Sequence, residues 1–210
     1  MQKKTYYHII LDQSGSMQNC IAPTISGFNE QLQVVQSMEE RFPEQEVTIG
    51  LTRFNNDIMD TYTAQKPAVA QPLDRQVYVP HGGTALLDAI GKTVLKLQER
   101  TAAEMQRGEA TVVVVILTDG HENASRLFTL PGIRQLIKEL EETGKWTFSF
   151  LGATLDAMKA ARDLHIKAQN SMSFSKSNIK DVFDTLGSSL NDYMEEKKLN
   201  RDPKSFLKGK

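Results

Sequence analysis

The feature that most constrains the fold of this chain is an unbroken apolar run, Val112–Leu117, which is followed by Thr118, Asp119 and Gly120. The run does not alternate with polar residues, so neither face of a strand built from it is suited to water. Such a run is typical of a strand buried on both faces of a parallel sheet. It is far shorter than the roughly 20 residues that cross a bilayer. The sequence therefore predicts a central parallel sheet with helices on both sides.

The remaining patterns alternate between strand-like and helix-like segments. Branched and aromatic runs predict strands, and apolar residues spaced by three and four predict amphipathic helices. The connection between the second and third strands is too short for a crossover, so these two strands should pair antiparallel. The whole chain is thus expected to be an α/β domain with about six strands, mostly parallel, and one antiparallel edge strand. The predicted strands are 6–11, 47–54, 58–63, 109–120, 146–153 and 171–175, and the predicted helices are 21–42, 81–100, 133–140, 156–166 and 179–193.

Composition narrows the class of protein. Hydrophobic residues make up 40% and charged residues 24% of the 210 residues, and the formal net charge is -1. These values are typical of a globular protein, and they provide no overall basic field for nucleic acid or an anionic membrane. Cys20 is the single cysteine, and the apolar stretch near the N-terminus is too short for a signal peptide, so we expect a cytoplasmic location.

The end of the chain differs from the rest. Residues 197–210 are rich in lysine and include Pro203. We predict one domain over residues 1–196 and a basic, flexible tail over 197–210, with a binding arm as the alternative for the tail.

Polar side chains gather where two predicted strands end. Asp12, Ser14 and Ser16 follow the first strand at every second position, and Asp119 follows the central strand. In a doubly wound sheet, ligands bind at the carboxyl ends of strands where the strand order reverses. The helix that opens near Thr84 should begin at this same edge. These five residues are therefore expected to lie together.

Two carboxylates and three hydroxyls form a cluster of hard oxygen ligands. The two acids would repel each other unless a cation or a proton neutralised them. Mg²⁺ suits such a cluster, because it accepts few carboxylates and keeps several waters, and Mn²⁺ or Ca²⁺ are possible substitutes.

Other interpretations of the same residues are weaker. Asp12 and Ser14 could cap the following helix, but capping does not require Asp119. An EF-hand loop needs glycine at its sixth position and glutamate at its twelfth, where Met17 and Pro23 stand. A phosphotransferase with Asp12 as nucleophile would, in haloacid-dehalogenase-like enzymes, have a second acid in place of Ser14.

The ordered set Asp12-Gln13-Ser14-Gly15-Ser16, Thr84 in "GGTALLDAI" and Asp119 in "LTDGHEN" resembles the metal-ion-dependent adhesion site (MIDAS) of the von Willebrand factor A-type (VWA) domain. The resemblance implies a Rossmann-like fold and an intact site. It also implies that Ser14 and Ser16 bind the metal directly, and that Asp12, Thr84 and Asp119 bind it directly or through water. Small stand-alone intracellular members of this family are associated with ATPase and stress-response partners.

The resemblance implies a non-enzymatic protein-interaction module in which an Asp or Glu of a partner completes the coordination of the metal. A metal-dependent hydrolase or phosphotransferase is the alternative, and a scaffold with a purely structural metal is a third. An enzyme would need a general base, for which the candidates are His81, His121 and Glu122. Asp88 is expected to interact favourably with the dipole of its helix.

Overall fold

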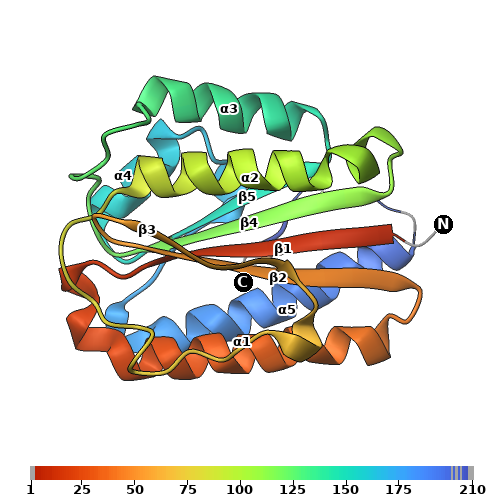
Figure 1. Cartoon of the computed structure of the whole chain (residues 1–210), viewed down its shortest axis with the longest axis horizontal. Coiled ribbons are helices and arrows are strands. Elements are labelled where there is room, and N and C mark those ends of the chain that lie inside the picture. Colours follow the sequence, from red (N-terminus) through yellow and green to blue (C-terminus); the bar gives the residue numbers. More distant parts are fainter. Residues whose placement is uncertain (1–2, 200, 202, 204, 208–210) are drawn as a thin grey trace.

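The computed structural model describes residues 3–199, 201, 203 and 205–207. Over these residues it has one six-stranded sheet with the strand order β3-β2-β1-β4-β5-β6 (Figure 1). All neighbouring strands are parallel except β2 and β3, which form the antiparallel edge pair. The predicted α/β, Rossmann-like sheet is confirmed. The strands are β1 (Lys3–Asp12), β2 (Gln45–Phe54), β3 (Ile58–Gln65), β4 (Ala110–Thr118), β5 (Trp146–Gly152) and β6 (Ser171–Ser173).

Helices cover both faces of this sheet, as the apolar run predicts, and they divide the core into two halves. One half lies under α1 and α5, and the other lies under α2, α3 and α4 (Figure 1). Every residue of β4 is buried. The helices are α1 (Ile21–Arg41), α2 (Leu86–Gln106), α3 (Leu130–Glu142), α4 (Leu155–Asp163) and α5 (Ile179–Lys198).

The strand order reverses between β1 and β4. From β1 the chain first builds outward to β2 and β3, and it then returns to the other side of β1 with β4. The loops that follow β1 and β4 therefore lead to helices on opposite faces of the sheet, α1 and α3, and they lie at the left of Figure 1. Ligands of doubly wound sheets bind at this kind of position. The connection from β1 to α1 contains the 3₁₀ helix η1 (Gly15–Cys20).

A buried histidine lies in the middle of the sheet. His8 of β1 faces Gly50 of β2 in the parallel register, and a Cβ on Gly50 would lie 2.0 Å from His8 Nδ1. The other ring nitrogen, Nε2, is 2.9 Å from Thr52 Oγ1. Glycine at position 50 thus provides the space that the imidazole occupies. Burial lowers the pKa of His8 to about 4, which keeps the ring neutral.

His8 makes the fold sensitive to acid. Its pKa is 6.5 in the unfolded chain and about 4 in the fold, so its contribution to stability is full above pH 6.5 and is lost as the pH falls towards 4. The loss amounts to about 3 kcal/mol at 1.36 kcal/mol per unit. Burial raises the pKa of Asp12 to about 6, so Asp12 has the opposite effect and loses stability as the pH rises from 3.8 to 6.

Comparing two variants separates these effects. Between pH 6.5 and 4, urea denaturation in EDTA should show that His8→Gln loses less stability than wild type. His165→Gln, which replaces an exposed histidine, should follow wild type. Equal pH dependence of wild type and His8→Gln would show that His8 does not cause the loss.

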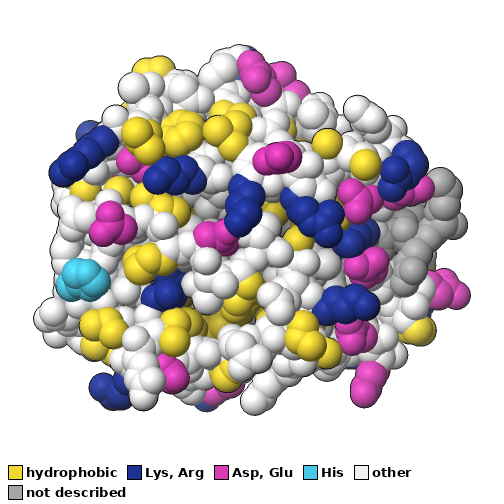
Figure 2. All heavy atoms as spheres, in the orientation of Figure 1, with side chains coloured by type: hydrophobic (Ala, Val, Ile, Leu, Met, Phe, Trp, Pro, Cys, Tyr) yellow, Lys and Arg dark blue, Asp and Glu magenta, His cyan; other side chains and the backbone are white. Residues whose placement is uncertain are grey.

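The surface and the chain end complete the fold. On the face seen in Figure 2, positive and negative side chains are interspersed, in keeping with the formal net charge of -1. Among the described residues, no helix is long and apolar enough to span a membrane.

Beyond α5, Phe206 and Leu207 are buried in the core half under α1 and α5, and Asn170 Oδ1 accepts a hydrogen bond from the Phe206 N–H at 2.9 Å. The division into residues 1–196 and a flexible tail of 197–210 stays a prediction, since part of the tail lies outside the described residues.

Candidate metal centre

Asp12 is the most deeply buried residue of the candidate site, with no exposed surface. Its Oδ1 accepts a hydrogen bond from the Ser14 N–H at 2.7 Å, and its Oδ2 accepts one from Thr118 Oγ1 at 2.5 Å. Its backbone carbonyl accepts the hydroxyl of Tyr78 at 2.7 Å. These bonds fix the carboxylate at the end of β1 and shape the turn that follows.

Ser14, Ser16 and Asp119 form a continuous chain of hydrogen bonds between the two central strands. The hydroxyls of Ser14 and Ser16 are 3.0 Å apart, and Ser16 Oγ donates to Asp119 Oδ1 at 2.7 Å. Ser14 precedes η1, but its side chain makes no capping bond there. Its hydroxyl therefore belongs to the site, and the alternative in which Ser14 serves as a helix cap is not supported.

Thr84 reaches the same place from the loop before α2. A Cβ built on Gly120 would lie 3.0 Å from Thr84 Oγ1 and 3.6 Å from Ser16 Oγ, so both hydroxyls border the space above this glycine. The structure thus brings together all five predicted residues, Asp12, Ser14, Ser16, Thr84 and Asp119. Gly15 has no positive φ, and a Cβ there would meet the Gly82 carbonyl oxygen at 3.4 Å, so it allows close approach rather than an unusual turn.

The loop after β4 is tied to the start of α2 by three polar side chains. Asn123 Oδ1 accepts from the Thr84 N–H at 2.8 Å, and the Asn123 N–H donates to the Thr84 carbonyl at 3.1 Å. Glu122 Oε2 accepts from the Leu87 N–H at 2.9 Å. Asp88 accepts the N–H groups of residues 126–128, each at 2.9 Å. These bonds hold Thr84 at a fixed position relative to Asp119.

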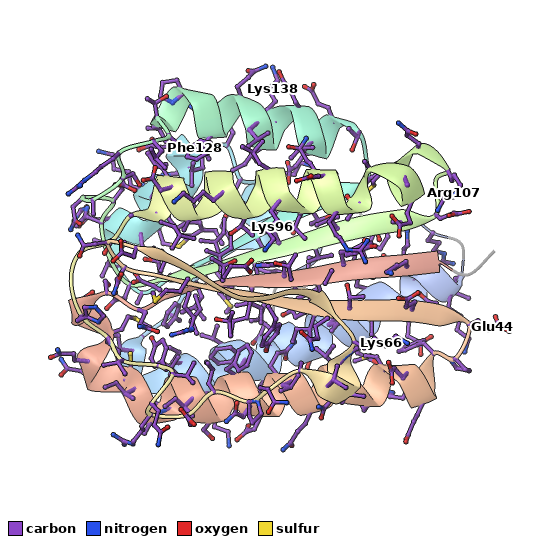
Figure 3. The ribbon with its side chains drawn as sticks, in the orientation of Figure 1. Glu44, Lys66, Lys96, Arg107, Phe128 and Lys138 are labelled. Atoms are coloured by element: carbon purple, nitrogen blue, oxygen red, sulfur yellow. The ribbon has the colours of Figure 1, made fainter. Side chains whose placement is uncertain are left out.

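Asp88 does more than the predicted interaction with its helix dipole. Although burial opposes it, the three backbone N–H bonds lower the pKa of Asp88. Phe128 lies against α2 beside its N-terminal half (Figure 3), where a Cβ on Gly91 would lie 2.5 Å from the ring. The acid and the ring together fasten the loop to the helix.

The three candidates for a general base are engaged in other contacts. His81 Nδ1 is 2.8 Å from the Val79 carbonyl, and its ring also contacts Asn55. His121 Nε2 is 2.7 Å from Asp156 Oδ2. Both oxygens of Glu122 accept hydrogen bonds from the loop and from α2.

Sequence reasoning missed four residues that shape the site. Thr118 and Asn123 flank Asp119 closely, and their position in "LTDGHEN" could have pointed to them. Tyr78 and Lys176 come from distant segments and carry no motif. Lys176 Nζ forms an ion pair with Asp119 Oδ2 and donates to the Ser16 carbonyl at 2.7 Å.

The cluster relies on hydroxyls rather than on many acids. Among the described residues, no group of three or more His, Cys, Asp or Glu is placed to hold a metal ion. A site with two carboxylates and several hydroxyls suits a hard divalent cation that retains water, such as Mg²⁺.

Comparisons with solved structures support the same fold. A VWA2 paralog of ArnB from Sulfolobus acidocaldarius is 17% identical with a TM-score of 0.55, over 89% of this chain and 45% of that one. Manganese-loaded TRAP protein of Plasmodium vivax is 14% identical with a TM-score of 0.57, over 86% of this chain and 71% of that one. Proximal thread matrix protein 1 of the mussel byssus, with a zinc-occupied MIDAS motif, is 16% identical with a TM-score of 0.53, over 92% of this chain and 45% of that one.

This chain therefore spans less than half the length of two of these structures. No curated protein sequence gives a significant match. The model of the von Willebrand factor type A domain matches residues 8–187, which is most of the chain. Domains of this family are usually non-catalytic modules for adhesion and protein interaction, typically with a metal at a MIDAS. The chain belongs to the von Willebrand factor type A domain family.

Proposed function

We propose that this domain binds a divalent cation, Mg²⁺ in the first place, and recognises an acidic side chain of a protein partner through it. The observation that carries the proposal is the convergence of five oxygen-bearing side chains from three separate loops at the reversal of strand order. The proposed metal-binding residues are Asp12, Ser14, Ser16, Thr84 and Asp119.

The contacts of the two serines and of Asp12 favour different roles in metal binding. Ser14 and Ser16 carry hydroxyls that are suited to direct binding. Both oxygens of Asp12 accept hydrogen bonds, so we assign Asp12 to orienting the loop and to holding water near the cation. When bound, the cation provides a Lewis-acidic position for a carboxylate oxygen of the partner.

The absence of a side chain at Gly120 supports the binding of a cation at this site. Because a Cβ at this position would approach two of the proposed hydroxyls, a larger residue would fill the space in which they converge. The manganese and zinc in two structures of the same fold are consistent with a divalent metal here.

The rim of the site is suited to protein contact. Leu127 is 66% and Leu155 is 89% exposed, and they belong to the segments that follow β4 and β5 at the edge that carries the site. A cleft of about 210 Å³ nearby is lined by apolar residues such as Leu130 and by Glu122 and Asp156. Exposed leucines beside a charged centre would add apolar contact to the metal-bound carboxylate.

The class of partner remains a proposal. We propose a protein that presents Asp or Glu, with an ATPase or a stress-response component as the first candidates, in the cytoplasm. A hydrolase or phosphotransferase is the alternative, although Glu122, one of its candidate bases, has both oxygens engaged in hydrogen bonds to the loop and to α2.

Affinity capture tests the proposal directly. Wild type in Mg²⁺ should retain a partner that is lost both on adding EDTA and in Ser14→Ala, because each change removes the metal-bridged contact. Ser188→Ala, which replaces an exposed serine of α5, serves as the matched control and should retain the partner. A partner retained equally by wild type in EDTA and by Ser14→Ala would contradict metal-dependent binding.

A further inference from the structure

A lysine side chain from a segment near the C-terminal end of the sequence reaches the candidate metal centre. Lys176 opens the short 3₁₀ helix η4 (Lys176–Asn178), which lies between β6 and α5. Its ammonium pairs with Asp119 Oδ2 and donates to the Ser16 carbonyl at 2.7 Å. Both of its partners belong to the proposed metal-binding residues. The ammonium therefore places a positive charge directly at the candidate metal centre.

The charges at this place explain the contact. The Asp119 side chain has no exposed surface, whereas 33% of the Lys176 side chain is exposed. Asp12 is a second buried carboxylate nearby, and repulsion from Asp119 adds to the burial that raises the pKa of Asp12. A buried acid without a partner is costly, so an ammonium from solvent-exposed η4 stabilises the metal-free site.

The loop that carries Lys176 has its own fixed shape. Ser175 Oγ accepts from the Ser177 N–H and lies 2.7 Å from Ser177 Oγ, which closes a turn around the lysine. The backbone thus directs the lysine towards the site without help from the metal. Because 33% of the Lys176 side chain is exposed, the ammonium can turn away from Asp119 into solvent.

A divalent cation and the ammonium would compete for the same oxygen of Asp119. We propose that Lys176 is a built-in competitor of the metal: it neutralises Asp119 in the metal-free protein and must withdraw when the metal binds, so it lowers metal affinity. The inference rests on the proposed metal-binding function of this site. It adds a residue that sets how much metal is needed to switch the domain to its binding state.

Calorimetric titration of Mn²⁺ into three proteins tests the inference. Lys176→Met keeps an unbranched side chain that is one atom shorter and removes the charge, and we expect it to bind Mn²⁺ about tenfold more tightly than wild type, which corresponds to about 1.4 kcal/mol. Lys180→Met is the matched control, because Lys180 lies four residues further on, in the first turn of α5, and pairs with Glu30 at 3.3 Å on the surface. Its Mn²⁺ affinity should equal that of wild type.

The outcomes separate this inference from the function on which it rests. Equal binding by wild type and Lys176→Met, or weaker binding by Lys176→Met, would overturn the competitor role and leave the metal site in place. An equal gain in Lys180→Met would also overturn it, since net charge alone would then explain the effect. Absence of binding by both wild type and Lys176→Met would instead contradict the proposed metal site.

Thermal unfolding provides a second readout. In EDTA, Lys176→Met should melt below wild type, because Asp119 loses its counter-ion. In saturating Mn²⁺, the gap should close or reverse, because the metal replaces the ammonium in both proteins. A gap of the same size and sign in EDTA and in Mn²⁺ would show that Lys176 acts only in the general stability of the fold.

Discussion

Mg²⁺ binding is expected to be lost in Asp119→Ala, with an affinity more than about a hundredfold below wild type, since even substitutions behind metal ligands cost about 10–100-fold. Asp119 is one of only two carboxylates in the candidate centre, and it is the one whose oxygens face Ser16 and Lys176. The alanine side chain can neither bind the cation nor accept from Ser16. Calorimetric titration measures the affinity.

Asp156→Ala is the matched control for this change. Asp156 carries the same charge at the nearby rim, where it pairs with His121, and 52% of its side chain is exposed. Its removal should leave the affinity for Mg²⁺ within about twofold of wild type, because exposed charges are well screened by salt. Unchanged binding in Asp119→Ala, or the same loss in both variants, would rule out a specific role for Asp119.

Gly50→Ala is expected to destabilise the fold by at least about 3 kcal/mol, at or above the upper end of the usual range for an overpacked core. The added Cβ would lie 2.0 Å from His8 Nδ1, and His8 is buried in the middle of the sheet between β2 and α2. A contact this short requires the strand backbone or the imidazole ring to shift. Since proteins are stable by only about 5–15 kcal/mol, urea or thermal unfolding should detect the change easily.

Two further variants test the cause. Gly50→Ala combined with His8→Ala removes the ring and should be more stable than Gly50→Ala alone. Gly108→Ala meets no atom within 4 Å and bears only the strain of a φ of +70°, so it should cost about 1 kcal/mol. If Gly50→Ala were no less stable than Gly108→Ala, the steric explanation would be wrong.

The sheet could be predicted because its signals are local. The apolar run of β4 requires burial on both faces, and the three-residue connection between Phe54 and Ile58 allows only an antiparallel pair. Gly144, with a φ of +69°, follows the C-cap of α3, a position at which glycine is common. Each of these features acts within a few residues, so the sequence alone contains the information.

The site could be predicted only in part. Asp12, Ser14 and Ser16 share one loop, and the strand order places Asp119 and Thr84 beside them. The contacts of Tyr78 and Lys176 with these residues cannot be predicted from the sequence, because both come from segments with no recognisable pattern. The position of Asp88 in its helix predicts only an interaction with the helix dipole, whereas its main partners are three backbone N–H groups of the loop after β4. Such loop contacts depend on tertiary structure rather than on residue spacing.

We propose above that a divalent cation binds among five side chains, Asp12, Ser14, Ser16, Thr84 and Asp119. The most direct test is an anomalous difference map from crystals grown in Mn²⁺, because manganese scatters anomalously and the light atoms of the protein do not. We expect one strong peak enclosed by these five side chains, with the Lys176 ammonium displaced from Asp119. A map without a peak at saturating Mn²⁺, with Lys176 still paired to Asp119, would contradict it.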